Sequence, residues 1–487
     1  MDGALVLAPL LALGLGACIV HGVARLITNR NEALAAVTAL AFAVGLGFAW
    51  HLGQGVTASG PLSWRAAARG MPLLAEPGAL LLTYVVLTLG LLVAVYSGRY
   101  VSLDRRYEYY YPLLLLLSAG LIGMLMATEL FTLYLFTMMA SAAAYVLVAF
   151  RRRTDTAIEA GFKYAIMGSV ATILFLTGLG CYYRDRGDLL LPAVSTRVGG
   201  WGALGMGLVL SSCAIKGALA PAHTWLPDAH GRAPSSVSAL LSGIVIEVNL
   251  YVMIKAALGM GWPPRSLGLM VVAFALVNMT LGNTMALMQI YGKRLLAYSS
   301  IAQMGYIMLP LGMGLASGRP EAVAAGLYVL VAHAAMKGLA FLCKGVSHYY
   351  LGSTLVEELD AFAHRLPLVG GAFVLALAGL AGVPPAAGFM AKWHSIVAML
   401  PIGGALVAVG IALLVVNSLL GVGYYVPLIG RVLRRPQGAA APLAVSLWME
   451  VPIVALAAAV LVLGVWPGPV LALSRQAAEF LLGWGVR

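Results

Sequence analysis

The chain alternates between long apolar stretches and short polar loops over its whole length of 487 residues. About fourteen of the stretches are long enough to cross a bilayer as helices, which takes roughly 20 predominantly apolar residues. The loops between them, such as 99–106, 151–153 and 431–435, are too short to hold a soluble domain. The pattern therefore predicts an all-α polytopic membrane protein. The expected spans begin near Ala4, Ala33, Pro77, Pro112, Leu130, Glu159, Ala203, Val237, Ser266, Ala297, Glu321, Pro367, Pro401 and Val451.

The composition agrees with this pattern. Hydrophobic residues make up 61% of the chain and charged residues only 10%, whereas soluble domains carry about 25% charged residues. The net charge of +12 would suggest nucleic acid as a partner of a soluble protein. Here it is better explained by loop residues that set the topology. The four cysteines are far apart and form no metal-binding or disulfide pattern.

The loop charges predict an orientation. Loops after odd-numbered spans carry about 15 Lys and Arg, and the opposite side about 9, and the richer side is expected to be cytoplasmic. We therefore expect both termini to lie outside, in a bacterial or archaeal cytoplasmic membrane.

Six lysines fall inside or at the edges of the expected spans. Lys163 follows Glu159 by one helical turn, which predicts a local ion pair. Lys255 lies near the end of a span, where its amine can reach the interface by snorkelling. A lysine in the middle of a membrane helix costs about 2.5–3.5 kcal/mol on insertion scales, so deeper lysines usually serve an ion pathway. The complete set is Lys163, Lys216, Lys255, Lys337, Lys344 and Lys392.

Four ionisable residues of the eleventh expected span follow helical spacing. At about 100° per residue, His333, Lys337, Lys344 and His348 fall within a sector of roughly 60°. One face of this helix is therefore polar from its middle to one end. Such a face on an otherwise apolar helix predicts a path that is accessible to water and protons.

Two expected spans are interrupted by prolines next to a lysine. Pro221 follows Lys216 closely and opens a short polar stretch with His223, and the double proline at 384–385 precedes Lys392. Proline frees backbone groups inside a helix. In a bilayer this is tolerated where the break is buried in protein or lines a wet cavity. The two breaks, in spans 7 and 12, therefore mark candidate ion sites.

The five-span separation of the breaks suggests an internal repeat. An odd number of helices per copy gives the two copies opposite topologies, so we expect two inverted five-helix repeats. The predicted division is a three-helix segment at 1–111, the repeats at 112–260 and 261–430, and a C-terminal helix at 431–487.

Four motifs in fixed order carry a family resemblance. They are KGALAPAHTWLPDAH from Lys216, APSSVSALLSG from Ala233, KRLLAYSSIAQMGY from Lys293 and GVPPAAGF from Gly382. Over roughly residues 76–425 the chain resembles the antiporter-like membrane subunits shared by respiratory complex I, membrane-bound hydrogenases and Mrp-type sodium/proton antiporters. It looks most similar to the D-type Mrp subunit and its hydrogenase relatives.

The resemblance implies fourteen helices, two inverted repeats and a proton path across the membrane midplane. It implies that Lys216 is the seventh-span lysine, Lys337 the central lysine and Lys392 the lysine at the exit side.

The chain departs from the family pattern at two positions. The fifth-span glutamate that usually pairs with the seventh-span lysine falls on Met138, and Glu129, nine residues earlier, matches a different acidic position. The lysine often found in the eighth span is replaced by Glu247. We therefore expect Glu247 to be the partner of Lys216, with Lys255 or a neighbouring subunit as its alternative partner. Otherwise the input half of the path is rewired or disabled.

A lysine-based proton path needs no nucleophile, metal or organic cofactor, and we expect no cofactor in this chain. Any catalytic redox centre is expected in other membrane subunits of a hetero-oligomeric complex, and nucleic acid is not expected as a partner. Three functions compete: a proton-translocating subunit of a redox complex, a subunit of a multi-component sodium/proton antiporter, and a structural subunit that no longer pumps. The candidate pathway residues are Lys216, Glu247, His333, Lys337, Lys344, His348, Lys392, Glu129 and His223.

Overall fold

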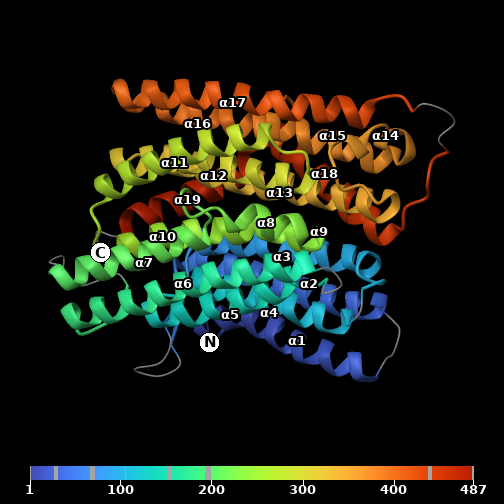
Figure 1. The fold of residues 1–487 in the computed structure, drawn as a ribbon. Coiled ribbons are helices and arrows are strands. Elements are labelled where there is room, and N and C mark those ends of the chain that lie inside the picture. The colour runs from blue at the N-terminus through green and yellow to red at the C-terminus, as the bar shows by residue number, and fades with distance from the viewer. Residues whose placement is uncertain are drawn as a thin grey trace.

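The computed structural model describes residues 2–26, 31–65, 72–104, 106–151, 155–191, 199–436 and 441–484. In these ranges the chain is almost entirely helical, and the helices run roughly along one common axis (Figure 1). By length and composition, eleven helices of the described ranges can cross a membrane. The prediction of a mostly helical, polytopic membrane protein is confirmed.

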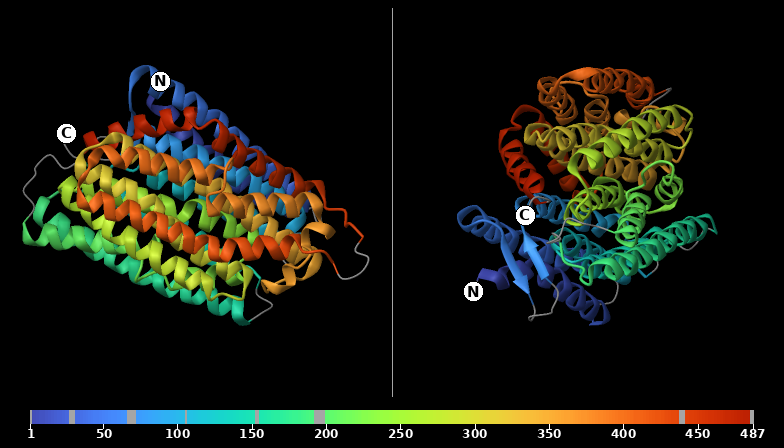
Figure 2. Two further views of the ribbon diagram at one scale, coloured as in Figure 1. Left: turned by 90° about the horizontal axis from the view of Figure 1, so that it is seen from above. Right: turned by 90° about the vertical axis from the view of Figure 1, so that its left-hand side faces the viewer.

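The N-terminal part contains the first six long helices and one feature that the sequence pattern did not predict. This feature is a short antiparallel hairpin, in which Leu62 pairs with Ala75 and Arg65 with Pro72. Both termini lie toward the same end of the bundle as the hairpin (Figure 2). The elements are η1 Asp2–Leu7, α1 Ala8–Leu26, α2 Asn31–Ser59, β1 Leu62–Arg65, β2 Pro72–Ala75, α3 Pro77–Tyr100, η2 Tyr107–Tyr109, α4 Tyr110–Met126, α5 Leu130–Val148 and α6 Asp155–Arg186.

The middle of the chain contains the first broken helix. α7 ends at Lys216, and the chain resumes as a helix only at Trp225, after a linker that contains Pro221. This break is at the predicted place. The elements are α7 Gly200–Lys216, α8 Trp225–Arg232, α9 Ser235–Leu240, the π-helical turn η3 Leu241–Val245, α10 Ile246–Gly259, α11 Pro264–Leu287, α12 Gly292–Ser317 and α13 Pro320–Leu351.

The C-terminal part contains the second predicted break, between Ala381 and Ala387 around the double proline. A further interruption at 466–467 was not predicted. The elements are η4 Glu357–Leu359, α14 Phe362–Arg365, α15 Pro367–Ala381, α16 Ala387–Met399, η5 Leu400–Ile402, α17 Gly404–Leu433, α18 Leu447–Val465 and α19 Gly468–Trp484.

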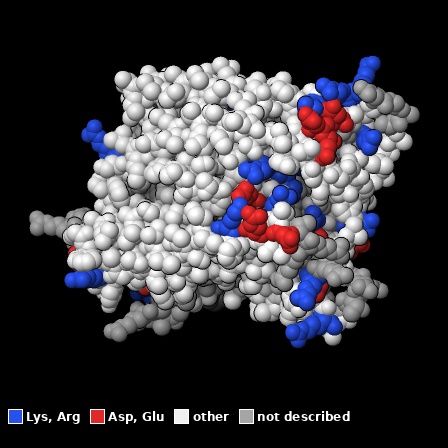
Figure 3. Space-filling view, in the orientation of Figure 1, with Lys and Arg blue, Asp and Glu red and all other residues white. Residues whose placement is uncertain are grey.

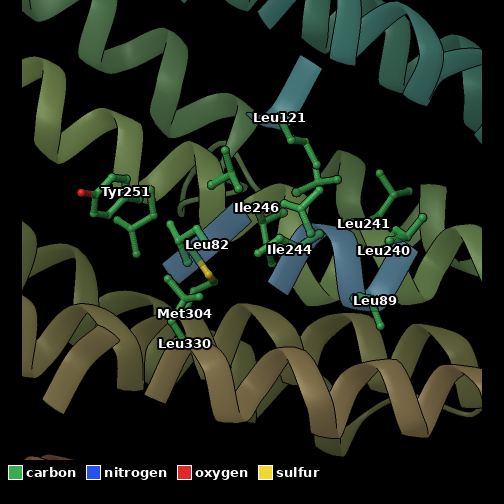
Figure 4. Packing of buried hydrophobic residues seen from close by; sticks show 14 of the residues in the cluster. Leu82, Leu89, Leu121, Leu240, Leu241, Ile244, Ile246, Tyr251, Met304 and Leu330 are labelled. Atoms are coloured by element: carbon green, nitrogen blue, oxygen red, sulfur yellow. The ribbon is translucent and has the colours of Figure 1, made fainter. Parts of the chain in front are cut away.

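The interior of the bundle is formed mainly by α9–α10, α12 and α13. In the most apolar 18-residue stretch of Ser235–Gly259 all residues are buried, and in that of Pro320–Leu351 89% are buried. In the corresponding stretches of α6 and α17 only 28% of the residues are buried. Figure 4 shows Leu240, Leu241 and Ile244 packed near Leu82 and Leu89 of α3. Polar side chains on α10 and α13 are therefore enclosed by protein, and each needs a partner inside the bundle.

Candidate functional site

Lys216 is the last residue of α7 and points into the bundle. Its side chain is almost fully buried, and Nζ donates a hydrogen bond to Ser141 Oγ of α5 at 2.8 Å. A cavity of about 20 Å³ lies beside the amine and is also lined by Thr137 and Asn249. This is enough room for roughly one water molecule. Among the described residues, the lining of this cavity is therefore partly polar and includes no carboxylate.

The prediction that Glu247 pairs directly with Lys216 is wrong. Val245 and Asn249 line the cavity beside Lys216. At about 100° per residue, a residue two positions before Asn249 points to nearly the opposite side of the helix. The Glu247 side chain therefore points away from α7, and its partner is His333 of α13.

Glu247 and His333 form a fully buried pair. Glu247 Oε1 and His333 Nδ1 share a hydrogen bond, and both side chains are 0% exposed. Glu247 lies two residues after the end of the π-helical turn η3. In this turn Gly243 approaches α13 closely, because a Cβ there would lie 3.2 Å from Ala334 O. Glu247 Oε2 and His333 Nε2 are buried without a hydrogen-bond partner among the described residues. The pair can thus hold a proton and still has one acceptor and one ring nitrogen to spare.

Lys337 lies one turn after His333 on α13. It is fully buried, and Nζ donates to Leu296 O at 2.7 Å and to Ser299 Oγ, both on α12. No carboxylate oxygen of the described chain lies within 4.0 Å of this amine. A charge on Lys337 is therefore stabilised by neutral oxygens alone.

His230 of α8 is a candidate that the sequence reasoning missed. Its ring stacks on Phe341 of α13 with centroids 5.0 Å apart. Both ring nitrogens are buried without a hydrogen-bond partner within the described ranges. Phe341 lies one turn after Lys337, so His230 sits beside the polar face of α13. A histidine inside a broken apolar span was the available signal.

Lys344 and His348 end the polar face near the C-terminus of α13. Lys344 Nζ donates to Ser353 O at 2.7 Å, to Ser353 Oγ at 3.0 Å and to Ser347 Oγ at 3.3 Å. His348 Nδ1 lies 3.3 Å from the same Ser353 carbonyl. Both side chains line a cleft of about 1260 Å³. One end of the polar face of α13 therefore reaches an open, charged space.

Lys392 lies on α16, just after the second break. Its amine donates to Ala381 O at 3.0 Å and lies 4.9 Å from the centroid of the Tyr306 ring. Ala381 ends α15, and carbonyl oxygens at a helix C-terminus attract cations. The aromatic face adds a cation–π contact. The broken helix thus supplies a site for a positive charge without a carboxylate partner in the described chain.

The remaining candidates, Glu129 and His223, lie apart from the polar face of α13. Glu129 precedes α5 and accepts a hydrogen bond from Thr132 Oγ1 at 2.8 Å, a local contact at a helix start. His223 lies in the linker between α7 and α8, with its ring centroid 6.5 Å from that of Tyr298. Its Nδ1 is buried without a partner in the described structure.

The two lysines expected near span ends behave differently. Lys163 pairs with Glu159 at 2.8 Å, as predicted, and also with Asp228 at 3.3 Å. The prediction that Lys255 snorkels is wrong, because α10 is enclosed by protein. Lys255 is 3% exposed, donates to the backbone of α4, and pairs with Glu76 at 3.5 Å. It is therefore not the partner of Glu247 either.

Comparison with known proteins places the same residues in one family region. Residues 127–421, which contain all nine candidates, match the model of the NADH:quinone oxidoreductase/Mrp antiporter transmembrane family. The F(420)H(2) dehydrogenase subunit N of Methanosarcina mazei is 31% identical over 419 residues, 82% of this chain and 83% of that protein. The NADH-quinone oxidoreductase subunit N of Desulforudis audaxviator is 34% identical over 385 residues, 74% of each chain.

Solved structures give the same grouping. A chain of the archaeal membrane-bound sulfane sulfur reductase superimposes with a TM-score of 0.89 at 26% identity, covering 98% of both chains. A chain of respiratory complex I from Thermus thermophilus gives 0.76 at 25% identity, covering 95% of this chain and 98% of that one. A chain of the Mrp complex from Dietzia sp. gives 0.87 at 23% identity, covering 99% and 97%, and shares the fold.

Proposed function

Because the chain belongs to the NADH:quinone oxidoreductase/Mrp antiporter transmembrane family, we propose that it is a proton-translocating, antiporter-like membrane subunit of a complex I-like redox complex. Its relatives by sequence are named as subunits N of such dehydrogenases. Its own candidate residues are all proton-binding side chains, so the electron-transfer centres belong to other subunits of the complex.

The single observation that carries this proposal is the series of ionisable groups along α13. His333, Lys337, Lys344 and His348 lead from the bundle interior to the charged cleft, and each has a polar partner on another element or in the following loop. Keeping such groups inside a membrane bundle is costly unless they carry ions or protons. A structural subunit has no need of them.

The proposed transfer step lies between the Glu247–His333 pair and Lys337. The pair holds a proton between a carboxylate and an imidazole, and Lys337 lies one turn further along α13. The Lys337 amine is stabilised only by Leu296 O and Ser299 Oγ. Its proton can therefore move to a neighbouring acceptor without breaking an ion pair. Each step is a proton transfer, in which one N–H or O–H bond breaks and another forms.

The proposed architecture has fourteen spans and two inverted repeats. Nineteen α-helices lie in the described ranges. They reduce to fourteen spans when the four-residue α14 is set aside and α7–α8, α9–α10, α15–α16 and α18–α19 each count as one. We place the first repeat at 112–260 and the second at 261–430, flanked by 1–111 and 431–487. Both termini face outward, and the cleft lies at the cytoplasmic end.

Particular observations also favour the two other functions, a sodium/proton antiporter subunit and a structural subunit. The shared fold with the Mrp complex is compatible with sodium/proton exchange. The neutral surroundings of Lys216, with Ser141 as its partner and methionine at position 138, favour a subunit that has lost its input half. The ionisable series on α13 argues against the latter.

One reconstitution experiment separates the three functions. The chain is purified in mild detergent with its partners, the partners are identified, and the complex is placed in vesicles that contain a pH-sensitive dye. Proton uptake that starts only on addition of electron donor and acceptor supports the proposal. Uptake driven by a sodium gradient without redox substrates indicates an antiporter. A complex whose proton uptake does not change when Lys337 is replaced contains this chain as a structural subunit, and the proposal is then wrong.

A further inference from the structure

The cleft at the end of α13 has a strong excess of positive charge. It lies between α4, α5, α6, α8, α12 and α13 and has a volume of about 1260 Å³. Seven basic and three acidic residues line it, which leaves an excess of four positive charges. The basic residues are Arg106, Arg151, Lys163, Arg232, Lys293, Arg294 and Lys344, and the acidic ones are Asp104, Glu159 and Asp228.

The acidic residues neutralise only part of the lining. Arg151 pairs with Asp104 at 3.1 Å, and Asp228 holds both Arg294 at 3.2 Å and Lys163 at 3.3 Å. The other four basic residues have no carboxylate oxygen within 4.0 Å in the described part of the chain. These are Arg106, Arg232, Lys293 and Lys344.

Three of the basic residues meet where α8 ends and α12 begins. Lys293 Nζ donates to Ala233 O at 2.8 Å, next to Arg232. Arg294 reaches back over Gly231, where a Cβ would lie 3.3 Å from Arg294 Cγ. Two guanidinium groups and an amine thus converge on one region of the wall, and such a group of donors suits a phosphate.

The lining of the cleft also includes apolar side chains. These are Pro112 and Leu113 of α4, Val146 of α5, Phe150 just after α5, and Ala160 of α6. Charged side chains gather over α8 on the lateral face of the bundle, and a broad band beside them is uncharged (Figure 3). The charges therefore lie at the border of the apolar band.

We propose that this cleft binds an anionic phospholipid, with its phosphate among Arg232, Lys293 and Arg294 and an acyl chain along Leu113 and Phe150. Basic pockets between membrane helices are suited to anionic headgroups. A free phosphate matches the basic side chains but leaves the apolar lining residues without a partner. The inference does not depend on the proposed function, because binding requires only the cleft.

The test measures lipid binding to the intact complex. The complex is stripped of lipid by detergent exchange, incubated with mixed micelles of phosphatidylglycerol and phosphatidylcholine, and analysed for bound lipid by native mass spectrometry. The wild type is expected to bind phosphatidylglycerol preferentially, and less tightly at high salt. Neutralising one basic residue, in Arg232→Gln or in Lys293→Gln, should weaken binding about five-fold, the equivalent of ~1 kcal/mol per residue.

Arg475→Gln is the matched control, because Arg475 lies on α19, pairs with Glu479 at 3.1 Å and does not line the cleft. It should leave lipid binding unchanged. Arg232→Gln keeps the test valid if Lys293→Gln disturbs folding. The Arg232 side chain is exposed and makes no hydrogen bond or ion pair within the described chain.

The proposal is overturned by no preference for the anionic lipid, by equal binding in Arg232→Gln and wild type, or by an acidic segment of another subunit cross-linked into the cleft. Inorganic phosphate that displaces the lipid completely at low millimolar concentration identifies a phosphate site and also overturns it.

Discussion

Glu247 of α10 and His333 of α13 share a hydrogen bond in the most enclosed part of the bundle. This contact joins α10, which follows the π-helical turn η3, to the helix that carries the polar face. It also separates Glu247 from Lys216, which lies on the other side of α10 and bonds to Ser141. The Glu247 carboxylate is therefore paired with the second half of the chain.

Glu247 and His333 should be strongly coupled in a double-mutant cycle. Glu247→Gln and His333→Gln each leave the other group buried without its partner, at a cost of about 1–3 kcal/mol. The double variant should recover part of this loss, with a coupling energy of about 0.5–3 kcal/mol. The coupling energy is measured from thermal unfolding and proton transport of the wild type, the two single variants and the double variant. The pair of Glu247→Gln with Lys216→Ala is the control and should be additive. Coupling in the control pair but not in the first would contradict the observed partners.

Lys337→Met should reduce redox-driven proton uptake to the level of passive leak and leave the complex assembled. No carboxylate within 4.0 Å in the described chain pairs with Lys337, so its removal strands no opposite charge. Gel filtration checks that the complex is assembled, and the pH-sensitive dye measures proton uptake. Lys163→Met, which removes an exposed lysine of a surface pair, should transport normally. Loss of assembly in Lys337→Met would indicate a structural role.

Ser141→Ala should slow transport, whereas Met138→Leu should not. Ser141 Oγ is the hydrogen-bond acceptor of the buried Lys216 amine, and its removal leaves that amine unsatisfied at a cost of about 1–3 kcal/mol. Met138 instead contacts Thr172 of α6 through its sulfur at 3.3 Å, and leucine has a similar volume. Transport rates of both variants in vesicles check the difference. Equal rates in the two would mean that the Ser141–Lys216 contact has no part in transport.

Glu358 should make the loop after α13 sensitive to acid. Its carboxylate accepts hydrogen bonds from the backbone N–H groups of Thr354 and Leu355, which lower the pKa of Glu358 below its usual value of 4.5. Because the pKa is lower in the folded protein, the stabilisation is present above pH 4.5 and is lost as the pH falls through the folded pKa. Glu358→Gln should therefore lower the melting temperature slightly at pH 7 and weaken its dependence on acid.

The matched control for this loop is Glu357→Gln. Glu357 is 79% exposed and reaches Arg431 only at 3.9 Å, and such surface pairs contribute little. Its melting curves at pH 7 and pH 4 should overlay those of the wild type. If the melting curves of Glu358→Gln also overlay those of the wild type at both pH values, the hydrogen bonds from Thr354 and Leu355 to Glu358 do not stabilise the loop.

The orientation can be checked by cysteine labelling. In a chain whose own cysteines are replaced by serine or alanine, a membrane-impermeant maleimide added to intact cells should modify Ser59→Cys and spare Leu103→Cys. Ser59 ends α2 near the hairpin, and Leu103 lies in the exposed loop after α3. Modification of Leu103→Cys alone would reverse the membrane orientation and place the cleft outside.

The sequence determined the features that depend on neighbouring residues of the same segment. The expected span starts at Leu130 and Pro367 coincide with helix starts, because the hydrocarbon core fixes how long an apolar helix must be. The breaks near Pro221 and 384–385 lie where proline removes a backbone donor. The polar face of α13 followed from the 100° step of a helix alone.

Only the tertiary structure decided which helices those residues meet. Glu247 contacts His333, Lys216 contacts Ser141, and Lys255 contacts Glu76, and none of these pairings was predicted. A change of one position turns a side chain by about 100° around its helix. The partner therefore depends on how the helices are rotated against each other, and this rotation is set by the packing of the whole bundle. The spacing of residues along the chain does not determine this rotation.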